Sequence, residues 1–191
     1  MGNKTKEDKY RFFYPPEFEK MFDFLNKNGK FTAEFMINSG CRIMEARGFK
    51  DDPVFDDQRN NITLKKTKVR ARLKEKVPRS RTIPINKKYY SKLKRDFKTH
   101  RILSTNAFNI QLRDACVKAK ITNPEQFSSH NIRKTFATWL LSLGCDGFKL
   151  AKHLGHTPNE LAKDYATNDV FNHSDKQIMR SIVGDLPSRI S

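Results

Sequence analysis

The 191-residue sequence predicts a mainly helical α+β domain that contains one small antiparallel β-hairpin. Most of the chain has apolar residues three or four positions apart, which is the spacing of an amphipathic helix. Only residues 60–86 differ, because two short alternating stretches there flank a long cationic segment. A chain of this length buries one sizeable core. We therefore expect one domain over residues 1–170, followed by a C-terminal tail or helix over residues 171–191.

The first helices are predicted from turn signals that separate helical runs. Pro15 and Pro16 are typical of a first helical turn, and the apolar residues after them keep helical spacing. We expect Asn28-Gly29 to end this helix. A second run over residues 31–38 leads into Ser39-Gly40, and a third helix begins just after that glycine.

The hairpin is predicted from alternation at residues 62–64 and 82–85. Between the two strands lies KKTKVRARLKEKVPRSR, residues 65–81, which is too basic to be buried. We expect a long cationic tip, for which the simpler interpretation is a solvated, mobile loop. A tip of this kind can also contact the backbone of a nucleic acid and make binding salt dependent.

Two further stretches, residues 89–97 and 107–120, have helical periods, and a weaker helix is predicted over residues 174–183. Trp139 and the phenylalanines are most simply core residues. The core candidates of the second stretch are Ile110, Leu112, Ala115 and Val117.

Residues 128–144 predict another amphipathic helix. Ser128 and Ser129 are N-cap candidates, and Gly144 ends the helix. His130 and Arg133 are three residues apart in its first turn, so both side chains can project from one face, near a helix end that favours anions.

A short helix over residues 148–154 is then closed by Gly155, which leaves His156 at a bend. Pro158 is placed to begin a third helix. Tyr165 follows nine residues after His156, two turns into that helix or at its frayed end.

Composition indicates a polyanionic partner. The formal net charge is +17 and the isoelectric point is about 9.9, which favours nucleic acid. A membrane is not expected, because no apolar run is long enough to span a bilayer. Cys41, Cys116 and Cys145 are scattered, which fits a reducing compartment and argues against both disulfides and zinc. His153 and His156 lack a carboxylate or cysteine partner, so we expect no metal.

Four segments together resemble the tyrosine recombinase (phage integrase) family. HNIRKTFAT at residues 130–138, then LGH at 154–156, then Tyr165, is similar to the catalytic C-terminal box of that family. SGCRIMEA at 39–46 is similar to its first arginine box, and ITLKKTK at 62–68 to the strand and turn that carry its lysine. The resemblance covers residues 10 to 170 approximately. Lys134 replaces a common histidine and Met44 a small residue, and neither change removes a catalytic group.

The resemblance implies cleavage and rejoining of DNA strands through a 3′-phosphotyrosyl intermediate, as a site-specific recombinase or integrase. Tyr165 would be the nucleophile. Arg42 and Arg133 would bind the non-bridging phosphoryl oxygens, His130 would be a general base or a phosphate donor, and His156 would donate to the same phosphate.

The other implied roles fall on the hairpin and on residues beside the arginines. Lys68 would be the general acid, with Lys66 as the competitor. Glu45 and Thr135 would orient the arginines; for the Arg42–Glu45 pair the simpler alternative is a surface ion pair, which is worth little. Further DNA contacts are expected from Lys65, Lys66, Arg70, Arg72 and Lys134. No cofactor is expected, because cations already surround the phosphate.

The partner implied is double-stranded DNA, bound by a dimer or tetramer, and a monomer is one option for the free protein. The C-terminal segment would pack on its own domain or be exchanged between protomers. We expect a cytoplasmic protein of a prokaryotic cell or of its virus or plasmid. Family members usually have an N-terminal DNA-clamping domain. We do not expect one here, because the sequence begins close to the first arginine box, so we expect a fragment or a minimal enzyme. Two alternatives stay open, a type IB topoisomerase-like relaxing activity and a non-catalytic DNA-binding domain.

Overall fold

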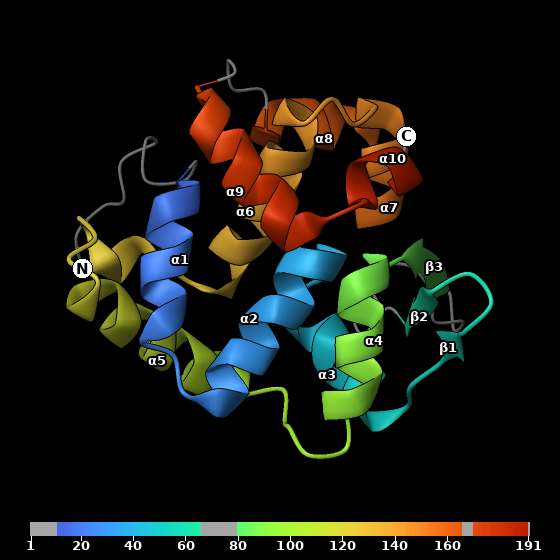
Figure 1. Ribbon diagram of the computed structural model, residues 1–191, viewed down its shortest axis with the longest axis horizontal. Coiled ribbons are helices and arrows are strands. Elements are labelled where there is room, and N and C mark those ends of the chain that lie inside the picture. The colour runs from blue at the N-terminus through green and yellow to red at the C-terminus, as the bar shows by residue number, and fades with distance from the viewer. Residues whose placement is uncertain (1–10, 66–79, 166–169, 191) are drawn as a thin grey trace, which may run out of the picture.

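The computed structural model describes residues 11–65, 80–165 and 170–190, with the backbone alone at residues 160 and 163–165. Helices make up most of the molecule and a small sheet lies at one edge (Figure 1). The helices are α1 (Pro15–Asp23), α2 (Lys27–Ser39), α3 (Ile43–Asp51), α4 (Lys87–Asp96), α5 (Thr105–Lys118), α6 (Ser129–Ser142), α7 (Gly147–Leu154), α8 (Pro158–Tyr165), α9 (His173–Val183) and α10 (Leu186–Ile190), with a 3-10 turn at Pro124–Gln126. The predicted α+β class is confirmed.

The sheet has three antiparallel strands in the order β1 (Phe55–Asp56), β2 (Asn61–Lys65) and β3 (Ser80–Pro84). β2 and β3 form the predicted hairpin, in which Leu64 lies opposite Arg81. The two-residue β1 was not predicted, because a segment that short has no readable alternation. The tip between β2 and β3 lies outside the described residues.

Helix α6 supplies the centre of the core. It packs against α2, and its Phe136 and Trp139 are fully buried. The indole nitrogen of Trp139 donates a hydrogen bond of 3.0 Å to the carbonyl of Phe13, so the chain entering α1 is attached to α6. The core prediction for Trp139 is therefore confirmed.

The predicted end of the first helix at Asn28-Gly29 is wrong. Helix α1 ends at Asp23, and the side chain of Asn26 accepts a hydrogen bond of 2.9 Å from Gly29 N, which makes Asn26 the N-cap of α2. Gly29 lies in the first turn of α2, on the side that faces α5. A Cβ at this position would lie 1.7 Å from Oε1 of Gln111 on α5.

Two of the predicted core residues of α5 are exposed, Ile110 and Val117. They lie seven positions apart and so share one face of the helix. The face that packs inward carries Phe108 and the two correctly predicted residues, Leu112 and Ala115.

The C-terminal segment packs on its own domain. Helix α9 contacts α1 and α2, and α10 contacts α7 and β3 (Figure 1). Met179 and Val183 of α9 are fully buried. Exchange of this segment between protomers stays a prediction. In the described part of the chain, no helix combines the length and the apolar character needed to cross a bilayer.

Candidate active site

Three of the predicted catalytic side chains meet at one point. Arg42 is the N-cap of α3, Arg133 lies on α6, and His156 follows α7. The Nη2 atoms of the two arginines lie 3.3 Å and 2.8 Å, respectively, from Nε2 of His156. Two guanidinium groups from distant parts of the chain thus converge on a single position, as the sequence pattern predicts.

A tight turn after α2 places Arg42. Gly40 is the C-cap of α2 in the left-handed region, at φ 61°. A Cβ there would lie 2.4 Å from the ring of Phe136, so both the backbone conformation and the packing require glycine. Two residues later the backbone N–H of Arg42 donates a hydrogen bond of 2.8 Å to Oε2 of Glu45, which fixes the start of α3.

Arg133 is fully buried and joins two helix ends. Its Nη1 donates to the carbonyl of Gly40 and its Nη2 to the carbonyl of Leu154, both at 2.7 Å. These carbonyls lie at the C-terminal ends of α2 and α7, where helix dipoles favour a positive charge. Arg42 and His156 each follow one of these carbonyls by two residues. Arg133 therefore sets the distance between the other two members of the cluster.

Glu45 lies beneath the arginines and is 3% exposed. Its carboxylate forms a bidentate pair with Arg81, at 2.6 Å and 2.9 Å. Arg42 Nη1 and Arg133 Nη1 are farther away, at 3.6 Å and 3.7 Å. Burial alone would raise the pKa of Glu45, but the hydrogen bonds and charge of Arg81, the backbone N–H of Arg42 and the charge of Arg133 lower it to about 2. The buried, shared carboxylate does not fit a simple surface ion pair.

The position of His156 constrains its proton. Guanidinium groups only donate hydrogen bonds, so Nε2 accepts in these contacts and the tautomer that fits them carries its proton on Nδ1. In this arrangement Nε2 cannot donate to a phosphate. An anion that bound both arginines would take the place of Nε2 as their acceptor, or the imidazole would have to change its tautomer.

The other predicted catalytic residues are described less fully. His130 is exposed in the first turn of α6. Tyr165 is the last residue of α8, which packs against α6 and α7, the two helices that carry Arg133 and lead to His156. Lys68 and its competitor Lys66 lie outside the described residues.

Of the predicted DNA contacts, some lie within the described residues and others do not. Arg70 and Arg72 lie outside the described residues. Lys65 is the last described residue of β2 and forms an ion pair with Asp52. Lys134 is 5% exposed. It is buried in α6, as Arg133 is, so its contact with DNA stays a prediction.

The expectation that Thr135 orients the arginines is wrong. Its hydroxyl accepts a hydrogen bond of 2.9 Å from Phe13 N and donates one of 2.8 Å to the carbonyl of Asn131. The side chain is fully buried. Thr135 therefore attaches the segment before α1 to α6.

Two residues near the cluster were missed by the sequence interpretation. Arg81 was assigned to the cationic tip, yet it lies in β3 and pairs with Glu45. The sequence contained a signal for this position. Side chains alternate along a strand, so Arg81 shares a face with Ile83 and Ile85, which are both buried.

His153 was set aside as one half of an unsupported metal pair, and it is the second missed residue. Its Nε2 lies 2.9 Å from the carbonyl of Ser39, its ring stacks on Phe136, and burial lowers its pKa to about 3. It is thus a neutral link between α7 and the end of α2. Among the residues that the structure describes, no group of three or more histidine, cysteine or acidic side chains could hold a metal ion.

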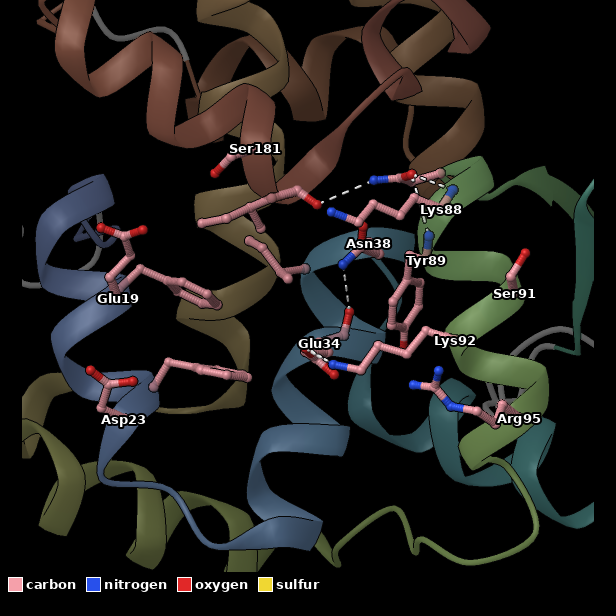
Figure 2. A pocket seen from close by; sticks show the side chains of 15 residues that line it. Glu19, Asp23, Glu34, Asn38, Lys88, Tyr89, Ser91, Lys92, Arg95 and Ser181 are labelled. Atoms are coloured by element: carbon pink, nitrogen blue, oxygen red, sulfur yellow. Dashed lines mark hydrogen bonds and ion pairs between the residues drawn. The ribbon is translucent and has the colours of Figure 1, made fainter.

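A pocket of about 740 Å³ opens elsewhere, between α1, α2, α4 and α9. Figure 2 shows Glu19 and Asp23 on one side of it, and Lys92 and Arg95 on the other. None of the predicted catalytic residues lines it. The convergence of the two arginines, and not this pocket, therefore marks the candidate site.

Residues 11–171 match the profile of the phage integrase family. The chain belongs to this family. No curated protein matches the chain in sequence.

Two solved structures share the fold of this phage integrase family member. XerA recombinase is 18% identical with a TM-score of 0.60, over 89% of this chain and 62% of that one. XerH site-specific recombinase, in a pre-cleavage complex with its difH substrate, is also 18% identical, with a TM-score of 0.58, over 81% of this chain and 48% of that one. The chain thus spans about six-tenths of XerA and about half of XerH.

Proposed function

We propose that this protein cleaves and rejoins DNA strands through a 3′-phosphotyrosyl intermediate, as a site-specific recombinase or integrase. The observation that carries the proposal is the convergence of Arg42 and Arg133 on one position, 3.3 Å and 2.8 Å from the same nitrogen of His156. Guanidinium groups offer paired donors that match the two non-bridging oxygens of a phosphodiester. Membership of the phage integrase family supports the same chemistry.

In the proposed reaction the phenol oxygen of Tyr165 attacks the phosphorus of a DNA strand. The new bond joins tyrosine to the 3′ phosphate, and the bond from phosphorus to the 5′ oxygen breaks. His130 accepts the phenol proton, and Lys68 gives a proton to the departing 5′ oxygen. Attack by another 5′ hydroxyl reverses these steps and rejoins the strand, so bond energy is conserved without a cofactor.

Arg42 and Arg133 stabilise the negative charge that builds on the phosphoryl oxygens. Loss of one such donor costs about 2.7–4 kcal/mol in related oxyanion sites. Binding of the phosphate would release Nε2 of His156 from the arginines. In the other tautomer, with the proton on Nε2, His156 could donate a hydrogen bond to the same phosphate.

The proposed partner is double-stranded DNA in the cytoplasm, bound by a dimer or tetramer. The net charge of +17 supports a polyanionic partner, and the XerH structure holds that protein on its DNA substrate. Lys65, Lys66, Arg70 and Arg72 stay in the proposal as backbone contacts. Lys134, which is buried in α6, also stays a proposed contact.

The test is capture of the covalent intermediate. A library of nicked duplexes with random sequences, incubated at low salt, lets the cleaved fragment diffuse away and traps the adduct, which a denaturing gel detects. We expect an adduct with the wild type, none with Tyr165→Phe, and a normal amount with the control Tyr14→Phe, which removes the hydroxyl of an exposed tyrosine.

Each other outcome has a defined meaning. An adduct that survives Tyr165→Phe would reject Tyr165 as the nucleophile. Binding of the duplexes with no adduct at any sequence would favour a non-catalytic DNA-binding domain. An adduct together with relaxation of supercoiled plasmid, but no exchange between sites, would favour a topoisomerase-like activity.

A further inference from the structure

Arg81 connects three separate parts of the candidate active site. From β3, its Nη1 and Nη2 donate to the two carboxylate oxygens of Glu45 on α3, at 2.6 Å and 2.9 Å. Its Nε donates to the carbonyl of His153 on α7, at 2.9 Å. One guanidinium thus joins the sheet to the helix that begins at Arg42 and to the helix that leads to His156.

This contact is shielded from water. The side chain of Arg81 is 14% exposed and that of Glu45 is 3% exposed. The Arg81 guanidinium also lies against Gly155, since a Cβ there would be 3.5 Å from Nη1 and 3.7 Å from Cζ. Gly155 directly precedes His156, so Arg81 limits the space into which the backbone before His156 can move.

The distances around Glu45 show which arginine holds the carboxylate. Arg81 makes two hydrogen bonds to it, whereas the nearest approaches of Arg42 and Arg133 are 3.6 Å and 3.7 Å, beyond hydrogen-bonding range. A buried carboxylate needs hydrogen-bond donors. Without Arg81, the other two guanidinium groups are the nearest cations to supply them, and both would turn away from the position of the phosphate.

We propose that Arg81 is a positioning residue for DNA cleavage. It donates hydrogen bonds to both carboxylate oxygens of Glu45, so that the guanidinium groups of Arg42 and Arg133 stay available to the scissile phosphate. This role rests on the function proposed above. Arg81 does not itself reach the reacting atoms. It also fixes the base of the hairpin, because its strand partner is Leu64 and only the pair Lys65 and Ser80 lies between it and the tip that carries Lys68.

The test compares Arg81→Gln and Arg81→Lys with the wild type, with Arg95→Gln as the control for loss of one positive charge from an exposed site. The rate of adduct formation is measured at saturating DNA, and DNA affinity is measured separately. We expect Arg81→Gln to lower the rate about 10- to 100-fold, as displaced catalytic groups do, and Arg81→Lys to lower it less. DNA affinity should change no more than in the control.

A double variant separates positioning from simple loss of structure. If Arg81 acts by saturating Glu45, then Glu45→Gln in the Arg81→Gln background removes the competing carboxylate and should recover part of the lost rate. A merely structural role predicts a further loss. Thermal unfolding of each variant identifies any that are unfolded at the assay temperature. If Arg81→Gln is not folded, the rate is measured with Arg81→Lys in its place, which keeps the charge.

The acid side of the pH profile gives a second readout. The groups that face Glu45 are Arg42, Arg81, Arg133 and the thiol of Cys41. Burial raises the pKa of Glu45, and Arg81 makes the largest contribution that lowers it. Loss of Arg81 should therefore raise this pKa, and the rate should become sensitive to pH at less acidic values than in the wild type.

The two proposals fail in different ways. No adduct with the wild type overturns the proposed function, and the role of Arg81 with it. A wild-type adduct that forms equally fast with Arg81→Gln, or a double variant slower than Arg81→Gln, overturns the role of Arg81 alone.

Discussion

The carboxylate of Glu45 should make the fold less stable at acidic pH. The substitution Glu45→Gln should remove this contribution to the pH dependence. Its pKa falls from an ordinary 4.5 to about 2 in the folded protein. That difference corresponds to about 3 kcal/mol of stability. Because the folded pKa is the lower one, this stability is present above about pH 4.5 and is lost as the pH falls towards 2; about 2 kcal/mol is gone by pH 3.

Glu45→Gln removes the charge but keeps a side chain that can cap α3. At pH 7 this loss of charge should destabilise the fold, since Arg133 is fully buried beside the carboxylate. Removing one partner of a buried pair typically costs about 3–5 kcal/mol. We therefore expect a gap of about that size between wild type and variant at pH 7, which shrinks by about 2 kcal/mol at pH 3.

The assay is urea unfolding between pH 3 and pH 7, followed by the fluorescence of Trp139, the one tryptophan of the chain. Asp57→Asn is the control. Asp57 is 65% exposed and accepts hydrogen bonds from Lys94 and from the hydroxyl of Tyr90. The amide oxygen of asparagine can still accept both, so this substitution should leave the stability curve almost unchanged. A gap between wild type and Glu45→Gln that stays constant with pH would refute the reasoning, because it would mean that Glu45 ionises equally easily in the folded and unfolded chains.

Two further predictions concern residues that join helix α6 to other segments, Thr135 and Gly40. Thr135→Val should lower the free energy of unfolding by about 1–3 kcal/mol, because the N–H of Phe13 loses its acceptor; urea unfolding measures this, and an unchanged midpoint would contradict it. Gly40→Ala should cost about 1–3 kcal/mol more than Gly144→Ala in the same assay. Both glycines have positive φ, but only at Gly40 does a Cβ meet another group, the ring of Phe136 at 2.4 Å; equal losses would show that this packing does not matter.

The parts of the site that could be predicted from sequence depend on local signals. Gly40 and Gly155 end helices in the left-handed region, and Ser128 caps α6. Each signal acts within a few residues, so the turns that place Arg42 and His156 are predictable from the sequence around them.

The predictions that failed depend on contacts between distant segments. Ile110 and Val117 have the same helical spacing as a buried stripe, and only the packing of α5 decides which face turns inward. Asn28-Gly29 is a common stop signal, yet it lies in the first turn of α2, where Gly29 packs beside Gln111 of α5. Arg81 is 36 positions from Glu45, so alternation could show that it points inward but not which acid it meets.

The three arginines around Glu45 differ in exposure, and each has a different role. Arg133, fully buried, holds the ends of α2 and α7. Arg81, 14% exposed, satisfies the carboxylate. Arg42, 45% exposed, is the one most open to a ligand. A substitution at Arg42 should therefore lower the rate of DNA cleavage with little effect on folding. A substitution at Arg133 should lower both the rate and the stability, because the guanidinium proposed to bind the phosphate also connects α2 and α7, the helices that place Arg42 and His156.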